Sequence, residues 1–499
     1  MNTDLKKSAE LPIVIVGAGL GGLSAAIHLA AAGRHVLMFE KNERVGGKLN
    51  SISEAGYTFD IGPSLMTMPW VLRETLAAAG THLEDELVLL PVEPACRYYW
   101  PDGTRFEMWQ SLPRLLEAIR QLEPADVSGF LRFLAYTSRI YDAAAEPFML
   151  HPFTNLRELI TPALLSNSLA IDPLRTVDQA VKSFFSSPYL RQLFNRYATY
   201  NGSSPYRAPA TFNIIPFVEI SQGGWYVRGG MYTIAEALER SARKLGVEIH
   251  TSRPVASIGS FQGRAQRVVL ASGEEIPAAA IVVNADPRYA YSQLIEGGEA
   301  SAAGLRKLEL SCSGFILLLG VDRQYAALSQ HTIFFSQDYP QEFAAIFEHG
   351  VPAPDPSIYV HVTACVDRQH APAGHMNMFI LVNAPAHTGR ISWQREADGY
   401  ADLIIRKLER MGLEGLSAHI DYRHIITPAE LQERYHAPGG AIYGLASNSP
   451  WTAFLRPPIR ARDRKGLFFV GGGTHPGGGI PLVLLSGRAA AQAVMSFEF

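Results

Sequence analysis

Cysteine and charge are both scarce in this chain of 499 residues. Its three cysteines, Cys96, Cys312 and Cys365, are scattered, so we expect reduced, cytosolic thiols and no disulfide framework. The 15 histidines show no metal-ligand spacing, and we expect no metal site. Charged residues make up 18% of the chain, below the usual share, which indicates extra apolar surface or an apolar pocket. The net charge of −3 gives no electrostatic case for nucleic-acid binding.

A long uncharged run that could span a bilayer is also missing. The start of the chain, with Lys6 and Lys7 before an apolar stretch from Leu11, could imitate a secretory signal peptide. However, the glycines of that stretch follow a turn pattern, and Glu40 comes where a nucleotide-binding fold needs an acid. We therefore expect a cytoplasmic chain that is soluble or bound to the membrane surface.

Glycine is concentrated near the start of the chain. Residues 17–22 read Gly-Ala-Gly-Leu-Gly-Gly; they follow the apolar run 11–16 and open a segment of helical character, 23–30. A second apolar run, 35–39, ends in Glu40, about 20 residues beyond the glycines. A strand, a glycine turn, a helix, a second strand and an acid in this order predict a dinucleotide-binding unit.

The residues of this unit have separate predicted tasks. Gly17 permits the tight turn, Gly19 lets the backbone approach a pyrophosphate, and Gly22 lets helix and strand pack closely. The pyrophosphate would sit at the helix N-terminus, where free N–H groups and the helix dipole favour negative charge. Glu40 would accept hydrogen bonds from the ribose hydroxyls.

The residues after Glu40 help to decide which dinucleotide is bound. Residues 40–48 read Glu-Lys-Asn-Glu-Arg-Val-Gly-Gly-Lys, and residues 56–64 read Gly-Tyr-Thr-Phe-Asp-Ile-Gly-Pro-Ser. The glycine pair lets the backbone approach a second part of the ligand, and Arg44 and Lys48 add cations near its phosphates. The alternative is an ordinary glycine turn with two solvated cations. In this position the extension resembles that of flavoproteins that keep FAD as a resident cofactor.

A second glycine-rich motif lies near the other end of the chain. Residues 466–482 read Gly-Leu-Phe-Phe-Val-Gly-Gly-Gly-Thr-His-Pro-Gly-Gly-Gly-Ile-Pro-Leu, and a strand at 467–470 runs into this loop. Pro481 stands near the first turn of the helix that follows, a position that proline favours. The N-terminus of that helix would point at the flavin ring and stabilise negative charge on the reduced form. Its predicted apolar face consists of Val483, Leu484, Ala490 and Val494.

With this motif the chain resembles the bacterial phytoene desaturase-type carotenoid desaturases, within the amine-oxidase-like FAD superfamily. The resemblance covers nearly the whole chain, and its most specific motifs are the Thr-His-Pro-Gly-Gly-Gly-Ile-Pro loop and Ser-Cys-Ser-Gly-Phe at 311–315. The family often has Trp-Phe-Arg-Pro where this chain has Ala-Phe-Leu-Arg-Pro at 453–457, which leaves the shape of the pocket there open. Other segments that carry the resemblance are 200–205, 229–232, 284–287, 371–374 and 443–445.

The resemblance implies an α/β fold with a Rossmann-type FAD-binding domain and an interleaved substrate domain, which combines a mixed sheet with a helical, membrane-facing insert. The FAD-binding domain would comprise residues 1–70, 225–299 and 456–499. Residues 71–224 would form the helical insert, and residues 300–455 the sheet-containing part. Non-covalent binding of FAD is expected from Gly17, Ala18, Gly19, Gly22, Glu40, Lys41, Gly47, Lys48, Gly62, Pro63, Ser64, Val255, Gly472, Gly479 and Ile480.

The helical insert contains the segment expected to meet a membrane. Bulky apolar residues stand beside prolines at 148–153 and 159–165, and Lys182, Arg191 and Arg196 lie nearby. Apolar wedges with neighbouring cations fit an interfacial patch. The alternative is a buried pair of core helices. The resemblance favours the membrane, because carotenoids reside in lipid.

Desaturation transfers a hydride to flavin and removes a proton from the neighbouring carbon, so the organic mechanism belongs largely to the cofactor. The sequence identifies no general base. By resemblance, the candidate catalytic residues are His475, Met231 and Arg456, with Pro476 and Ile480 beside them. His475 would either make a polar contact with the flavin or be a loop histidine that is hydrogen-bonded to backbone. Arg456 would anchor the loop, contact a flavin oxygen or form a salt bridge.

Three classes of function remain open. The first is an FAD-dependent carotenoid desaturase that introduces double bonds into a long linear polyene: phytoene, diapophytoene or a later intermediate. The second is a terminal-methyl carotenoid oxidase or a polyene saturase of the same family. The third is a non-enzymatic escort of prenylated proteins, against which the intact glycine motifs argue. The expected partners are a carotenoid, a membrane surface and an electron acceptor such as oxygen or a quinone.

Overall fold

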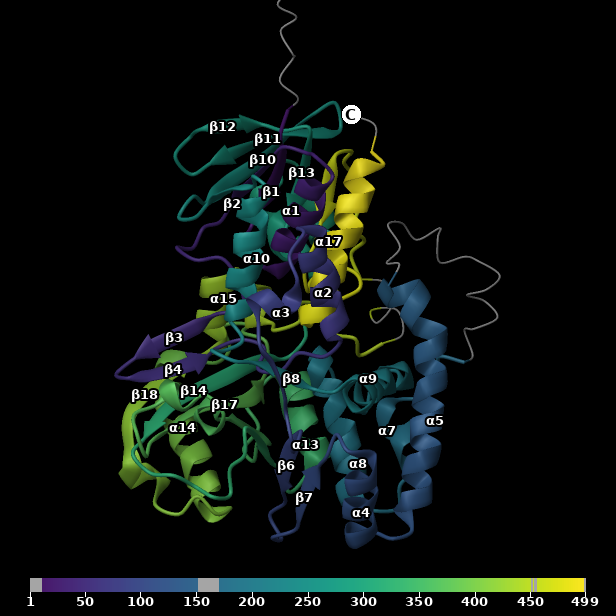
Figure 1. Ribbon diagram of the computed structural model, residues 1–499, viewed down its shortest axis with the longest axis vertical. Coiled ribbons are helices and arrows are strands. Elements are labelled where there is room, and N and C mark those ends of the chain that lie inside the picture. Colours follow the sequence, from purple (N-terminus) through teal and green to yellow (C-terminus); the bar gives the residue numbers. More distant parts are fainter. Residues whose placement is uncertain (1–10, 151–169, 450–451, 453–455, 498–499) are drawn as a thin grey trace, which may run out of the picture.

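A parallel sheet of five strands forms the upper part of the molecule in Figure 1. The computed structural model describes residues 11–150, 170–449, 452 and 456–497. The sheet joins strands from the start, the middle and the end of the chain. In sheet order they are β19 (Leu467–Phe469), β13 (Ala280–Val283), β1 (Ile13–Val16), β2 (Val36–Phe39) and β9 (Glu248–His250).

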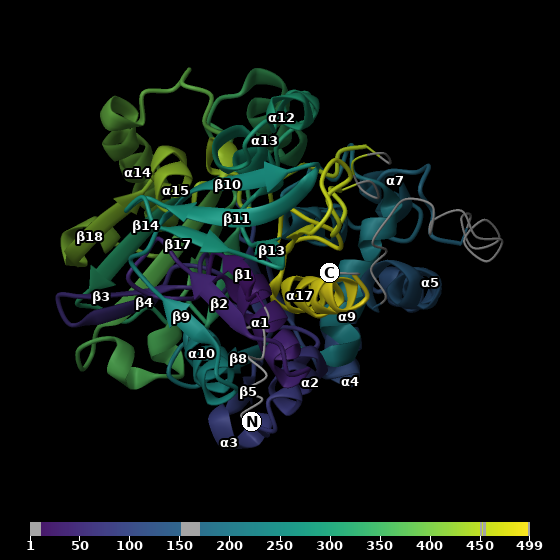
Figure 2. The ribbon, with the colours of Figure 1, turned by 90° about the horizontal axis from the view of Figure 1, so that it is seen from above.

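Apolar side chains on both faces explain why these strands form a buried parallel sheet. All four residues of β1 are buried, and successive side chains point to opposite faces. Ile13 and Ile15 belong to the core on the helical side, whereas Val14 and Val16 pack on the other side. Figure 2 shows the layers. The helices on one side are α1 (Leu20–Ala31), α10 (Thr233–Lys244) and α17 (Ile480–Met495), and the antiparallel strands on the other are β10 (Val255–Phe261), β11 (Arg264–Leu270) and β12 (Glu275–Pro277).

Helices α1 and α17 lie in direct contact, although they come from opposite ends of the chain (Figure 2). A Cβ atom built on Gly487 would lie 2.5 Å from the carbonyl oxygen of Gly21, so only glycine permits this approach. Ser24 Oγ also donates a hydrogen bond to the carbonyl oxygen of Leu484 (2.7 Å). The contact brings the N-termini of both helices to one side of the sheet.

A second, mixed sheet of seven strands lies below the first in Figure 1. Its centre is the antiparallel pair β14 and β17, which are matched over nine residues each. One face packs on α14 (Trp393–Arg410), where the Phe315 ring packs against Trp393, and Leu317 and Leu319 belong to the same core. In sheet order the strands are β18 (Ile420–Ile426), β14 (Ser313–Val321), β17 (Met376–Ala384), β16 (Ile358–His361), β15 (His331–Phe334), β6 (Cys96–Tyr99) and β7 (Arg105–Met108).

A helical unit stands beside this sheet, at the lower right of Figure 1. Its core is aromatic: the Phe133 ring packs against Phe194 at a centroid distance of 4.9 Å, and Phe185 stacks on Phe194 at 4.7 Å. Its helices are α4 (Leu112–Leu122), α5 (Asp126–Ala144), η1 (Ala145–Leu150), α7 (Val177–Lys182), α8 (Pro188–Asn195), η3 (Arg196–Asn201), η4 (Ala210–Asn213) and α9 (Ile214–Gln222).

The α/β class expected from the sequence is confirmed, and one feature of the sheet was not anticipated. Strands β6 and β7 come from within residues 71–224, yet β6 pairs in parallel with β15 of the other insert. Within the described residues, no helix is long and apolar enough to cross a bilayer. The remaining α-helices and strands are β3 (Ser51–Glu54), β4 (Tyr57–Asp60), α2 (Pro69–Ala78), α3 (Leu83–Glu86), β5 (Leu89–Pro91), β8 (Trp225–Val227), α11 (Pro287–Tyr289), α12 (Glu299–Arg306), α13 (Tyr339–Ala344), α14 (Trp393–Arg410) and α15 (Pro428–Tyr435).

Candidate active site

One cavity of about 690 Å³ connects the nucleotide-binding sheet with the seven-stranded sheet and the helical unit. It begins at the turn between β1 and α1 and extends between the face of β14 and β17 and helix α9. Of the residues predicted to bind FAD, all line this cavity except Ala18 and Gly22. Among the catalytic candidates, His475 and Arg456 line it, and Met231 does not.

The glycine turn after β1 is closely packed. Gly17 has a φ of +97°, in the region that glycine adopts at little cost. A Cβ atom on Gly22 would lie 2.4 Å from the carbonyl oxygen of Gly17, which explains why Gly22 shapes the turn without lining the cavity. Its N–H donates to Asn284 Oδ1. Gly19 caps α1 without a side-chain hydrogen bond, so first-turn N–H groups remain available to an anionic ligand.

Glu40 closes this end of the cavity. It follows β2 and is 5% exposed. Oε2 accepts the N–H of Ala18 (2.7 Å) and Oε1 that of Asn42 (2.9 Å), so the carboxylate is held against the glycine turn. Each carboxylate oxygen has a second lone pair, which leaves Glu40 able to accept hydrogen bonds from a ribose.

Two lysines lie on the cavity wall, and both reach across to backbone carbonyls. Lys41 Nζ donates to Arg434 O (2.8 Å), and Lys48 Nζ donates to Ile442 O (2.7 Å). Lys48 borders the cavity but is enclosed by protein, and this loss of hydration lowers its pKa to about 8, against the opposing effect of Asp286. A phosphate or another anion beside Lys48 would raise that pKa again.

The glycine loop between β19 and α17 forms another part of the wall, and Arg456 holds it in place. Arg456 is 4% exposed and donates to the carbonyl oxygens of Tyr443 (2.9 Å), Gly472 (3.1 Å) and Leu445 (3.0 Å). It also donates to Asn201 Oδ1 (3.2 Å) from the helical unit. Burial lowers its pKa to about 10. Arg456 therefore anchors the loop, which is one of the three roles expected for it. Among the described residues it forms no salt bridge.

His475 lies in the same loop and is 5% exposed. Burial and the neighbouring charge of Arg456 lower its pKa to about 3, against the opposing effect of a hydrogen bond with the backbone of Phe148. The imidazole is therefore neutral at physiological pH. The backbone bond that the sequence left as an alternative is present, and the contact with flavin stays a prediction.

Met231 is fully buried beside the cavity rather than in its wall. Its N–H donates to Asp60 Oδ2 (3.0 Å), and its side chain belongs to the core under α1 and α10. Burial raises the pKa of Asp60 to about 6. Met231 thus packs the wall from behind, and the structure gives it no position from which to touch a ligand in the cavity.

The part of the cavity away from the nucleotide motifs is a largely apolar chamber. Because side chains alternate along a strand, one face of β14 and β17 supplies its sheet wall while the opposite face packs on α14. Helix α9 and the segment before it supply the facing wall. Apolar residues that line this chamber are Phe148, Met149, Phe212, Ile214, Ile215, Val218, Ile316, Ile333, Phe335, Phe379 and Leu381.

Two polar groups on the chamber wall were missed by the sequence analysis. Tyr359 Oη lies 2.6 Å from Ser64 Oγ and 2.6 Å from His331 Nδ1, which links the nucleotide motif to the sheet. Burial lowers the pKa of His331 to about 3, so its ring is neutral. The second group contains Arg196, which was expected to be a cation at a membrane surface. That prediction was wrong, because Arg196 is only 8% exposed and lines the cavity.

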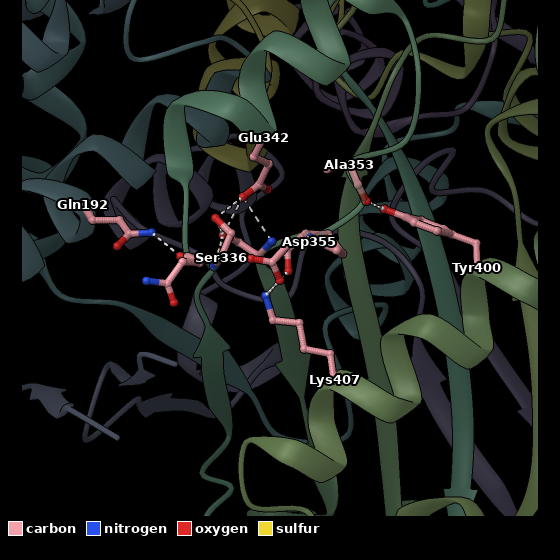
Figure 3. Close-up of polar contacts among 10 residues, drawn as sticks. Gln192, Ser336, Glu342, Ala353, Asp355, Tyr400 and Lys407 are labelled. Atoms are coloured by element: carbon pink, nitrogen blue, oxygen red, sulfur yellow. Dashed lines mark hydrogen bonds and ion pairs between the residues drawn. The ribbon is translucent and has the colours of Figure 1, made fainter. Parts of the chain in front are cut away.

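Behind the chamber, Glu342, Asp355 and Lys407 make polar contacts around one loop (Figure 3). Ser357 of that loop lines the cavity. Glu342 Oε2 accepts hydrogen bonds from Ser357 Oγ (2.7 Å) and Ser336 Oγ (2.8 Å). Lys407 of α14 points to the same loop and donates to Asp355 Oδ1 (2.5 Å). These contacts tie α13 and α14 to the end of the chamber.

Parts of two predicted segments lie outside the described residues. They are residues 151–153 and 159–165 of the expected membrane patch, and residues 453–455 of the segment that departs from the family pattern. The described part of the patch ends with Phe148 and Met149, which both line the cavity.

Comparisons with known proteins agree with this architecture. Residues 20–495 match the model of the family described as "Flavin containing amine oxidoreductase". The chain is 36% identical over 489 residues to a 4,4'-diapolycopene oxygenase of Methylomonas sp, covering 97% of this chain and 98% of the relative. It is 34% identical to the zeta-carotene-forming phytoene desaturase of Myxococcus xanthus, covering 97% and 94%. An oxidoreductase structure from Methanosarcina mazei shares the fold, with a TM-score of 0.66 at 16% identity, covering 97% and 100%.

Proposed function

Because the chain belongs to the flavin-containing amine oxidoreductases, and among them to the carotenoid desaturase type, we propose that it binds FAD non-covalently and oxidises a long linear polyene. The observation that carries this proposal is the continuity of the cavity. The dinucleotide motif borders one end of this cavity, and the apolar chamber forms the other end. An enzyme that removes a hydride from a hydrocarbon needs this arrangement, because cofactor and substrate must meet in one space.

The residues of the cavity fit FAD. Gly17 and Gly22 fill a turn that leaves no room for a Cβ atom, and Glu40 presents carboxylate oxygens where a ribose would lie. Gly479 lines the cavity with a φ of +106°, and a Cβ atom there would meet no protein atom within 4 Å, so the space it faces is open to a ligand. The loop between β19 and α17 contains no cysteine, which favours non-covalent binding.

When bound, the flavin would supply the chemistry by accepting a hydride from the polyene. The protein's share is to position the substrate and exclude water. The N-terminus of α17 would stabilise negative charge beside Ile480, and Arg456 would hold the loop that shapes this end of the chamber. The neutral His475 is compatible with an apolar substrate, because a charged imidazole would need a counterion in the chamber.

Desaturation is the reaction that we propose first, with phytoene, diapophytoene or a later carotenoid as substrate and oxygen or a quinone as final electron acceptor. Oxidation of a terminal methyl group is the second candidate, because several relatives more than 30% identical to this chain are named as oxygenases. A polyene saturase remains a variant of the second candidate.

Expression in cells supplied with phytoene, diapophytoene or lycopene, followed by mass analysis of the pigments, tests these proposals. Desaturation removes two hydrogens per step, terminal oxidation adds oxygen, and saturation adds two hydrogens. A protein that carries no flavin and leaves all three substrates unchanged would contradict the proposed function and support the escort class.

We also propose that the enzyme takes its substrate from a membrane surface, since a carotenoid is held in lipid. Phe148 and Met149 support this proposal, because they line the chamber at the start of the segment expected to touch lipid. Attachment would then be peripheral, through an apolar patch.

A further inference from the structure

A buried cation lies on the wall of the apolar chamber. Arg196 begins η3, directly after α8, and it lines the cavity together with Tyr200 and Glu219. Arg196 is 8% exposed and Glu219 is 4% exposed. We call these three residues, with Tyr98 and Tyr197 behind them, the Arg196 cluster.

The guanidinium of Arg196 has few acceptors for its five N–H donors. Nη2 donates to Tyr98 Oη (2.8 Å), and a further side-chain hydrogen bond joins the guanidinium and Tyr200, while Nε is buried without an acceptor among the described residues. The rings of Tyr98, Tyr197 and Tyr200 surround Cζ, with centroids at 5.4, 4.5 and 5.1 Å. Aromatic faces stabilise a cation, but they do not replace hydrogen-bond acceptors.

Glu219 does not pair directly with this cation. Its two oxygens accept hydrogen bonds from Tyr197 Oη (2.6 Å) and Tyr200 Oη (2.7 Å). Burial raises the pKa values of both phenols well above the usual range, so both are neutral donors. The tyrosines therefore lie between Arg196 and Glu219. Among the described residues, Arg196 has no ion-pair partner.

A pure hydrocarbon would gain nothing from such a wall. An incompletely paired guanidinium in an apolar chamber costs free energy unless a ligand supplies an acceptor. Because Glu219 already takes the donors of the tyrosines, the group that Arg196 lacks is an acceptor oxygen. We propose that the Arg196 cluster binds an oxygen-bearing end of the polyene, with an aldehyde or carboxylate oxygen accepting from Arg196. This inference rests on the proposed function, and among its candidate substrates it favours a later carotenoid that already bears an oxygen over phytoene and diapophytoene.

The position of the cluster gives such binding a consequence for the reaction. Helix η3 runs from Arg196 to Asn201, which accepts a hydrogen bond from Arg456 at the glycine loop. Five steps of a 3₁₀-helix span roughly 10 Å. That length is the separation of Arg196 and Asn201 along the helix. A polyene whose oxygen is held at Arg196 would have one end fixed relative to the glycine loop, so the cluster would select which carbon is oxidised.

The test compares two probes on the FAD-loaded protein, a linear polyene aldehyde and the hydrocarbon of equal length, both presented in phosphatidylcholine vesicles. Affinity is measured by quenching of tryptophan fluorescence. We expect Arg196→Met to lower the ratio of aldehyde to hydrocarbon affinity by tenfold or more, because one charge-assisted hydrogen bond is lost. Arg191→Met is the matched control: Arg191 lies outside the cavity wall and donates to Phe185 O (2.7 Å). It should leave the ratio within twofold of wild type.

An unchanged ratio in Arg196→Met, or an equal loss for both probes, would overturn the proposal and leave the cluster a structural support. If Arg196→Met does not fold, Tyr98→Phe provides the test, because it removes the protein acceptor of Nη2. The ratio should then hold or rise, and a fall would contradict the proposal. Failure of the proposed function is distinguishable, since it would show as a wild-type protein that binds the probes but oxidises neither.

Discussion

Replacement of Gly22 by alanine tests the nucleotide site with a single methyl group. The helical backbone of Gly22 accepts alanine without strain, so the effect is purely steric. Its Cβ atom would lie 2.4 Å from the backbone oxygen of Gly17, a contact that no side-chain rotation can relieve, and 3.0 Å from Asn284 Oδ1. The turn must therefore move relative to α1 by several tenths of an ångström or more. Overpacking of this kind costs about 1–3 kcal/mol of stability.

The larger effect should fall on the cofactor. Displacement of the turn takes backbone N–H groups away from the pyrophosphate. If two hydrogen bonds to charged oxygens are lost, at about 1.5–3 kcal/mol each, the Kd for FAD rises by about 10²- to 10⁴-fold. Titration of the apoprotein with FAD, followed by quenching of flavin fluorescence, measures this Kd, and thermal unfolding of the same samples measures stability.

A matched control is available in α14. Gly399 is also helical, but a Cβ atom there would meet nothing within 4 Å. Gly399→Ala should therefore raise stability by about 0.4–1 kcal/mol through the unfolded state and leave FAD binding unchanged. If Gly22→Ala binds FAD within twofold of wild type while the fold is intact, the pyrophosphate does not lie at this turn, and the basis of the proposed site is lost.

Three further predictions address the ribose, the buried histidines and the membrane. Glu40→Ala should weaken FAD binding by about 1–3 kcal/mol, measured in the same titration, and an unchanged Kd would exclude the ribose contact. His331 and His475 have pKa values near 3 in the folded protein, so between pH 3 and 6.5 they bind protons only in the unfolded state. The free energy of unfolding should therefore fall below pH 6.5, by about 2 kcal/mol for each histidine at pH 5. His331→Gln should flatten the pH profile of urea unfolding, and a profile as steep as wild type would refute this. Replacement of both Leu164 and Leu165 by aspartate should stop flotation with liposomes while FAD stays bound; a variant that still floats would place the membrane contact elsewhere.

The nucleotide-binding sheet could be predicted because its signals are local. β1, β2 and β19 are short apolar runs that end in glycines or an acid, and each was expected within one or two residues of its observed bounds. A parallel strand buried on both faces has a continuous apolar sequence, and a turn without room for a Cβ atom requires glycine. Such requirements can be recognised in a short stretch of sequence.

The chamber could not be predicted in the same way, because its walls come from segments that meet only in three dimensions. Strand β6 is short and has no feature that assigns it to β15, more than 200 residues away. Ser64 and His331 share Tyr359 as a partner, and nothing in their local sequences indicates this. The sheet and its polar links are products of tertiary packing.

Arg196 shows how the same limit led to a wrong prediction. Next to bulky apolar residues, a lone arginine is normally a surface cation, because charged side chains are seldom buried without a partner. Here three tyrosines surround the guanidinium, and they come from β6 and η3. Burial of this charge at the wall of an apolar chamber lowers the stability of the folded protein. A methionine of similar length would fill the same space without that loss of stability, so the presence of arginine is consistent with a functional use.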